Sequence, residues 1–90
     1  MKIGLYHTNV GALATPEFGR LAKQLGYDSL WTAEHIVLPD LPPGPQTAHS
    51  GTMPYLDPIV ALAYLAAHTH RMKLAIGVLL LTHHHPLLLA

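Results

Sequence analysis

The stretch that decides the fold is Leu25-Gly26-Tyr27-Asp28-Ser29-Leu30-Trp31-Thr32-Ala33-Glu34-His35. Gly26 stands where a residue in the left-handed conformation commonly ends a helix. Residues 27–33 form a short run with an apolar centre, which predicts a strand. Glu34 and His35 close that strand. The stretch therefore predicts a helix, a turn and a strand that ends in two ionisable side chains.

Toward the N-terminus, residues 2–8 predict a first strand, because they are largely apolar and run into the turn signal Asn9-Val10-Gly11. Tyr6 is expected to pack against a helix. Thr15-Pro16-Glu17 then predicts a helix start, since Thr can cap, Pro suits the first position and Glu favours the positive end of the dipole. The apolar residues at helical spacing in this helix are Phe18, Leu21, Ala22 and Leu25.

Toward the C-terminus, prolines and glycines exclude regular structure across residues 39–54. Asp57-Pro58 predicts a second helix by the same cap-then-proline logic. Its near lack of polar positions suggests that it is covered on more than one side. One face of it is expected to hold Ile59, Leu62, Ala63 and Ala66. Residues 72–81 predict a third strand buried on both faces, 82–85 a loop, and Pro86 the first residue of a third helix.

The order strand, helix, strand, helix, strand is typical of an α/β fold with a parallel sheet and right-handed crossovers. A barrel and an open doubly wound sheet both suit this order. The residues after the first strand, Asn9-Val10-Gly11-Ala12-Leu13, contain neither a G-x-G-x-x-G fingerprint nor a Walker A loop. A G-x-S-x-G elbow is also missing. These absences favour a barrel.

Composition limits the function classes. Half of the 90 residues are hydrophobic and 11% are charged, whereas soluble domains carry roughly 25% charged residues. Much of the surface is therefore expected to be covered by further chain or by a partner subunit. The formal net charge is zero and no basic stripe exists, which argues against nucleic-acid binding. The most apolar run, residues 74–81, is too short to span a bilayer, so we expect a cytoplasmic protein without membrane partners.

Candidate functional residues lie where the predicted strands end, because parallel sheets bind ligands at the carboxyl ends of their strands. These places are His7 after the first strand, Glu34-His35 after the second, and residues 77–83 around the end of the third. A histidine there can bind a cofactor ring or carry a proton. A purely structural role, bonded to nearby backbone, is the alternative for each.

The three consecutive histidines His83-His84-His85 resemble a metal-binding site. Adjacent residues of an extended chain point in opposite directions, however, so three in a row rarely converge on one ion. We therefore predict no metal ligands here. One of the three is expected to line the mouth of a polar pocket.

Several segments together resemble the luciferase-like monooxygenase superfamily. They are Met1-Lys2-Ile3-Gly4-Leu5 at the start, Leu25-Gly26-Tyr27-Asp28-Ser29-Leu30-Trp31 followed by Glu34-His35, then Tyr55-Leu56-Asp57-Pro58, and finally Leu74-Ala75-Ile76-Gly77-Val78 with His85-Pro86 after it. Each motif alone is weak, and their shared order and spacing carry the resemblance, which covers essentially all 90 residues. The first helix is about one turn shorter than is usual for the family.

The resemblance implies a (β/α)8 barrel of parallel strands with a flavin or deazaflavin at their carboxyl ends. The Trp-x-x-Glu-His pattern is more similar to the branch that uses coenzyme F420, and FMN is the other cofactor of the family. By this resemblance the catalytic residues are His35, beside the cofactor ring, and Glu34, which supports that site. Gly77-Val78 would form a cis peptide bond in a bulge behind the ring. Together with His7 and His83, which were singled out by their positions at strand ends, Gly77 and Val78 are the expected cofactor-binding residues.

Residues 1–90 would then be a partial barrel domain, an N-terminal β-α-β-α-β portion with the start of a third helix. We expect such a fragment to be an oxidoreductase by family, with a small-molecule substrate, yet inactive alone. The alternative is a non-catalytic remnant or a module that self-associates through its exposed apolar faces, forming a homo-oligomer. A histidine-rich metal binder is a third interpretation.

Overall fold

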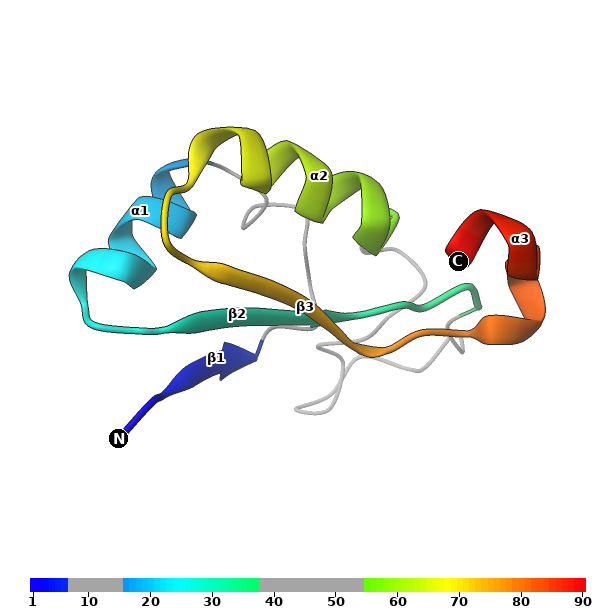
Figure 1. The fold of residues 1–90 in the computed structure, drawn as a ribbon, viewed down its shortest axis with the longest axis horizontal. Helices are drawn as coiled ribbons and strands as arrows, with labels where there is room; N and C mark the ends of the chain where they lie inside the picture. Colours follow the sequence, from blue (N-terminus) through cyan, green and yellow to red (C-terminus); the bar gives the residue numbers. More distant parts are fainter. Residues whose placement is uncertain (7–15, 38–54) are drawn as a thin grey trace, which may run out of the picture.

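The computed structural model describes residues 1–6, 16–37 and 55–90. The predicted loop at residues 39–54 and the candidate His7 lie outside the described residues. The elements in chain order are β1 (Gly4–Tyr6), α1 (Pro16–Gln24), β2 (Ser29–Ala33), α2 (Pro58–His68), β3 (Lys73–Val78), the 3-10 turn η2 (Leu81–His83) and α3 (Pro86–Leu89) (Figure 1).

The described strands form one parallel sheet in the order β1-β2-β3. Leu30 in β2 pairs with Leu5 of β1 on one side and with Leu74 of β3 on the other. This confirms the predicted α/β class with parallel strands. It also confirms that each strand follows its predecessor after a helical crossover, as far as the described residues show.

The two long helices lie on the same side of the sheet, as Figure 1 shows. Helix α2 contacts both α1 and β3. A doubly wound sheet places helices on both faces, whereas a barrel keeps all of them outside. Sequential strand order with helices on one face is therefore compatible with the first part of a barrel.

Strands β2 and β3 are shorter than predicted. Strand β2 starts at Ser29, and Asp28, the residue before it, bonds to the chain that precedes β1. The Ile3 N–H donates to Asp28 Oδ2 at 3.1 Å, and the Asp28 N–H donates to the Ile3 carbonyl at 2.8 Å. Strand β3 ends at Val78 instead of Leu81, and η2 occupies part of the predicted loop.

The helix starts are as predicted. Asp57 caps α2, with its Oδ1 accepting from the Val60 N–H at 2.9 Å, and Pro58 follows in the first turn. Helix α1 begins at Pro16 and is followed by Gly26, whose φ of +90° is the left-handed conformation expected there.

The buried faces of the helices differ from the prediction. Helix α1 buries Gly19 and Ala22, while Leu21 and Leu25 are exposed. Helix α2 buries Pro58, Ala61 and Leu65. The residues predicted to form its inner face, Ile59, Leu62, Ala63 and Ala66, are exposed or half-buried. A helix that is apolar nearly all round carries no periodicity to identify its inner face.

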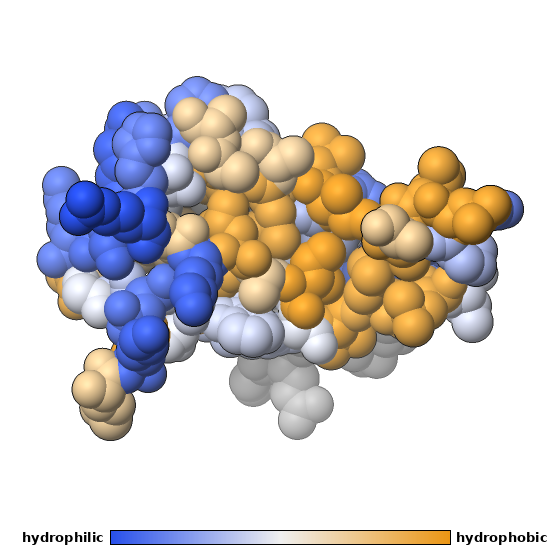
Figure 2. All heavy atoms as spheres, in the orientation of Figure 1, coloured by the Kyte–Doolittle hydropathy of each residue, from blue (hydrophilic) through white to orange (hydrophobic). Residues whose placement is uncertain are grey.

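Charged and apolar side chains separate along the sheet. Lys2 and Lys73 lie at or next to the beginning of strands, and Lys23 and Arg71 lie where the helices end, at that same edge. Figure 2 shows this edge as hydrophilic and the opposite edge, around α3 and the end of β3, as hydrophobic. The end of β3 and the neighbouring α3 therefore form a largely apolar surface in that view.

Among the described residues, no helix has both the length and the apolar character that a membrane crossing requires.

Gly19 allows α1 to approach the end of α2, and this contact gives a stability prediction with a defined sign. A Cβ atom at Gly19 would lie 2.5 Å from Thr69 Cγ2. The Thr69 hydroxyl donates to the Leu65 carbonyl at 2.8 Å, so its side chain cannot turn away without losing that bond. Gly to Ala within a helix ordinarily stabilises by about 1 kcal/mol. We expect Gly19→Ala to destabilise instead, as measured by urea unfolding.

Thr69→Ser supplies the matched control, since it removes only the Cγ2 methyl and keeps the hydroxyl. Adding Thr69→Ser to Gly19→Ala should recover the helix-propensity gain in a double-mutant cycle. If Gly19→Ala alone stabilises the chain, the close contact between the two helices is wrong.

Candidate functional site

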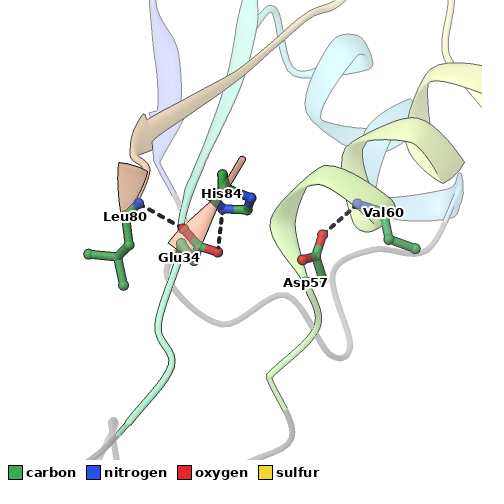
Figure 3. A network of polar contacts seen from close by, with 5 residues as sticks. All are labelled: Glu34, Asp57, Val60, Leu80 and His84. Carbon is green, nitrogen blue, oxygen red and sulfur yellow. Dashed lines mark hydrogen bonds and ion pairs between the residues drawn. The ribbon is translucent and has the colours of Figure 1, made fainter. Parts of the chain in front are cut away.

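A buried carboxylate lies at the carboxyl end of β2. Glu34 is 7% exposed, and both of its oxygens are engaged (Figure 3). Oε2 accepts from the Leu80 N–H at 2.7 Å, and Oε1 lies 2.9 Å from His84 Nε2. The Glu34 N–H donates to the Val78 carbonyl at 2.9 Å. Glu34 thus joins the end of β2 to the end of β3 and to the segment that follows it.

This arrangement explains why β3 ends early. The last bond across the two strands comes from the Glu34 N–H to Val78. Two residues later the Leu80 N–H donates to the Glu34 side chain and not to a strand, and η2 begins at Leu81. The chain leaves the sheet because a side-chain oxygen replaces the next backbone partner.

The three consecutive histidines take three different positions. His83 is exposed at the end of η2, and His84 lies against Glu34. His85 caps α3, with its Nδ1 accepting from the Leu87 N–H at 3.3 Å. Their side chains do not converge on one point. No group of three or more metal-ligating side chains that could hold an ion occurs within the described ranges.

His35, the sequence-predicted catalytic residue, follows Glu34 and is exposed. Its ring stands edge-on to Tyr55, with 5.3 Å between ring centroids and an interplanar angle of 67°. Tyr55 precedes the cap of α2, so this contact brings the end of β2 and the start of α2 together. An imidazole in this position can meet a ligand at the carboxyl end of the sheet.

Strand β3 contains the expected irregularity but in a different form. Thr32 pairs with Ile76 and Ala33 with Val78, which leaves Gly77 as the extra residue of a bulge. The predicted cis peptide at Gly77-Val78 is wrong, because no cis peptide bond occurs in the part of the chain that the structure describes. The extra residue accommodates the irregularity while the backbone stays trans.

Gly77 is also a point of close approach. A Cβ there would lie 3.1 Å from Tyr6 Cε2. Tyr6 shares its side of β1 with Gly4, and a Cβ on Gly4 would meet Ser29 and Trp31. The Tyr6 ring therefore lies over Gly77 on β3, a contact that the sequence did not predict.

The remaining predicted cofactor-binding residues lie near the carboxyl-terminal edge of the sheet, but they do not form an enclosed pocket. Val78 and His83 are exposed, and His7 is outside the described residues. Two surface hollows, lined by residues such as Arg20 and His68 in one and Lys2 and Lys73 in the other, lie toward the edge where the strands begin. Since the ionisable strand-end groups are at the other edge, we place the candidate site there and not in either hollow.

Sequence reasoning singled out Glu34, His35 and His83 and missed the role of His84. The sequence alone does not distinguish the three consecutive histidines at positions 83–85. They are distinguished by the early end of β3, since the turn at Leu81 determines which histidine faces Glu34. Thr32 adds a second buried polar group, whose Oγ1 has no hydrogen-bond partner within the described part of the chain.

Removing the Glu34 carboxylate should destabilise the chain more than removing an exposed one. Glu34→Ala leaves the Leu80 N–H and His84 without their acceptor, which we expect to cost about 2 kcal/mol of unfolding free energy. Glu17 forms an equally short pair with Arg20, 2.8 Å, on the exposed face of α1. Glu17→Ala should change stability by less than about 0.5 kcal/mol. Equal effects of the two variants in urea unfolding would contradict a structural role for Glu34.

Comparison with known proteins identifies the family. The family described as luciferase-like monooxygenase matches residues 4–90, which is nearly the whole chain. No match was found among curated proteins or among solved structures. The match spans β1 through α3 and includes every candidate strand-end residue named above. The chain belongs to the luciferase-like monooxygenase family.

Proposed function

We propose that the chain serves a flavin- or deazaflavin-dependent oxidoreductase, with the cofactor ring at the carboxyl ends of β1 to β3. The family match over residues 4–90 carries this proposal. The exposed His35 imidazole and the apolar strand-end surface support it. The sheet would form the first part of a (β/α)8 barrel, for which the parallel order and the one-sided helices are the support.

The described residues fit the ring of such a cofactor better than its phosphate. His35 supplies a hydrogen-bonding edge, and the bulge at Gly77 with the exposed Val78 supplies a backbone and apolar surface. Lys2, Lys23, Arg71 and Lys73 lie at the other edge of the sheet, and Arg20 lies on α1. A phosphate would therefore take its partners from outside these residues.

The two cofactors of the family supply different chemistry when bound: the deazaflavin F420 transfers hydride, and reduced FMN reacts with oxygen. The pattern Trp31-x-x-Glu34-His35 together with Tyr55-Leu56-Asp57-Pro58 supports F420 in this proposal. His35 would contact the ring as the catalytic residue. Glu34 would fix the backbone and side chains around it, and a small molecule would be the substrate.

Cofactor binding by the 90-residue chain tests this proposal without requiring turnover. We expect FMN or F420, titrated into ¹⁵N-labelled protein, to shift the NMR signals of His35, Gly77 and Val78. The reason is that these residues form the proposed ring surface. His35→Ala should weaken the response, because it removes the ring-edge donor.

His70→Ala is the matched control, since His70 is also an exposed histidine but lies after α2, at the edge where β3 begins. It should leave the titration unchanged. Shifts centred on His70, or no shifts with either cofactor, would contradict the proposed binding surface.

A second role, self-association, is supported by the exposed apolar surface in Figure 2. Leu87 and Leu88 on α3 are 81% and 86% exposed. Contiguous apolar surface of this kind is typical of interaction sites. We propose that copies of the chain associate through α3 and its surroundings, either in place of catalysis or in addition to it.

Sedimentation velocity tests this second role. We expect the chain to sediment above the monomer mass, and the double variant Leu87→Lys/Leu88→Lys to return toward it, because two charges would have to be desolvated in the contact. Leu25→Lys, at an exposed leucine beyond the end of α1, is the control and should keep the association. A stable, folded wild-type monomer would contradict self-association.

A further inference from the structure

We propose that His84 is a proton-carrying imidazole of the candidate site and that Glu34 is its positioning residue. The inference rests on the proposed function and assigns a further residue to it. It starts from the 2.9 Å contact between Glu34 Oε1 and His84 Nε2.

The Glu34 carboxylate is fixed in orientation. Its other oxygen, Oε2, accepts from the Leu80 backbone N–H at 2.7 Å, and the side chain is nearly fully buried. A carboxylate held at both oxygens cannot rotate to follow a mobile partner. The imidazole that it contacts is therefore held in one orientation as well.

This contact also selects the ring nitrogen that carries the proton. An ionised carboxylate only accepts hydrogen bonds, so the imidazole nitrogen that contacts Oε1 is the donor, and the ring proton lies on His84 Nε2. In the neutral ring, Nδ1 is then the nitrogen with the open lone pair. Figure 3 shows Nδ1 on the side of the ring turned away from Glu34.

The neighbouring histidines lack this combination. His85 uses its Nδ1 to accept from the Leu87 N–H as the cap of α3. His83 is exposed, with no carboxylate contact among the described residues. The His84 side chain is 17% exposed, which keeps it oriented by its surroundings yet reachable from solvent.

The proton movement that follows is simple. A proton leaving a small molecule bound at the strand ends would attach to His84 Nδ1 and form an imidazolium whose Nε2–H still donates to Glu34. The same nitrogen would then release the proton to water. A carboxylate that orients an imidazole and faces its cationic form is an established arrangement in acid–base catalysis.

Ring NMR of histidine tests the positioning half of the proposal. In ¹⁵N-histidine-labelled chain, His84 should show a single Nε2–H tautomer with a ring N–H proton that exchanges slowly with water. Glu34→Ala should abolish that proton signal. Should Glu34→Ala fail to fold, Glu34→Gln serves instead. Its side chain has the same length and keeps one oxygen acceptor, so the ring N–H signal of His84 should be retained. His83→Ala is the control and should leave it unchanged. Finding the proton on His84 Nδ1 would overturn the proposal.

Titration of the same sample with FMN and, separately, with F420 separates this proposal from the proposed function. We expect the cofactor that binds to shift the His84 Nδ1 signal together with the His35 ring signals, and to leave the His70 signals in place. A shift at His35 without one at His84 would overturn the role of His84 and leave the proposed function standing. Absence of shifts at both histidines with both cofactors would overturn the two together.

Discussion

The buried carboxylate of Glu34 is the interaction on which the carboxyl-terminal edge of the sheet depends. It accepts the Leu80 N–H and contacts His84, while its own backbone N–H makes the last bond to β3. Each partner comes from a segment about fifty residues away in the chain. A buried carboxylate without such partners would be strongly disfavoured. The turn after β3 and the placement of His84 therefore follow from the burial of Glu34.

The parts of the fold that were predictable from sequence are those with local causes. Asp57-Pro58 specifies the start of α2 through a cap and a proline, and Gly26 specifies the end of α1 through a left-handed backbone. The parallel order follows from the alternation of strands and helices. The inner face of α2 was not predictable, because an apolar helix without a polar side has no periodicity. The early end of β3 was not predictable either, since a long-range contact with Glu34 causes it.

The candidate site shows the same division. The position of Glu34-His35 at a strand end could be predicted from the pattern alone, and the structure places both residues there. The family match supports an oxidoreductase of the luciferase-like kind. Glu34 pairs with His84 and not with His83 or His85. This choice depends on the turn after β3, which no local sequence motif predicts. The family resemblance implied a bulge at Gly77, and the structure has one. The resemblance also implied a cis peptide bond there, whereas the backbone is trans.

The Glu34 carboxylate holds the chain in place after β3. Hydrogen exchange at the Leu80 amide measures this directly, because that amide donates to Glu34 Oε2 and to no strand partner in the described residues. The Lys73 amide, which donates to the Asp28 carbonyl at the other edge of the sheet, serves as the internal reference. We predict that Leu80 is protected in the wild-type chain and loses protection in Glu34→Ala while Lys73 keeps it. Exchange of the wild-type Leu80 amide at the rate of an unprotected peptide would contradict the account.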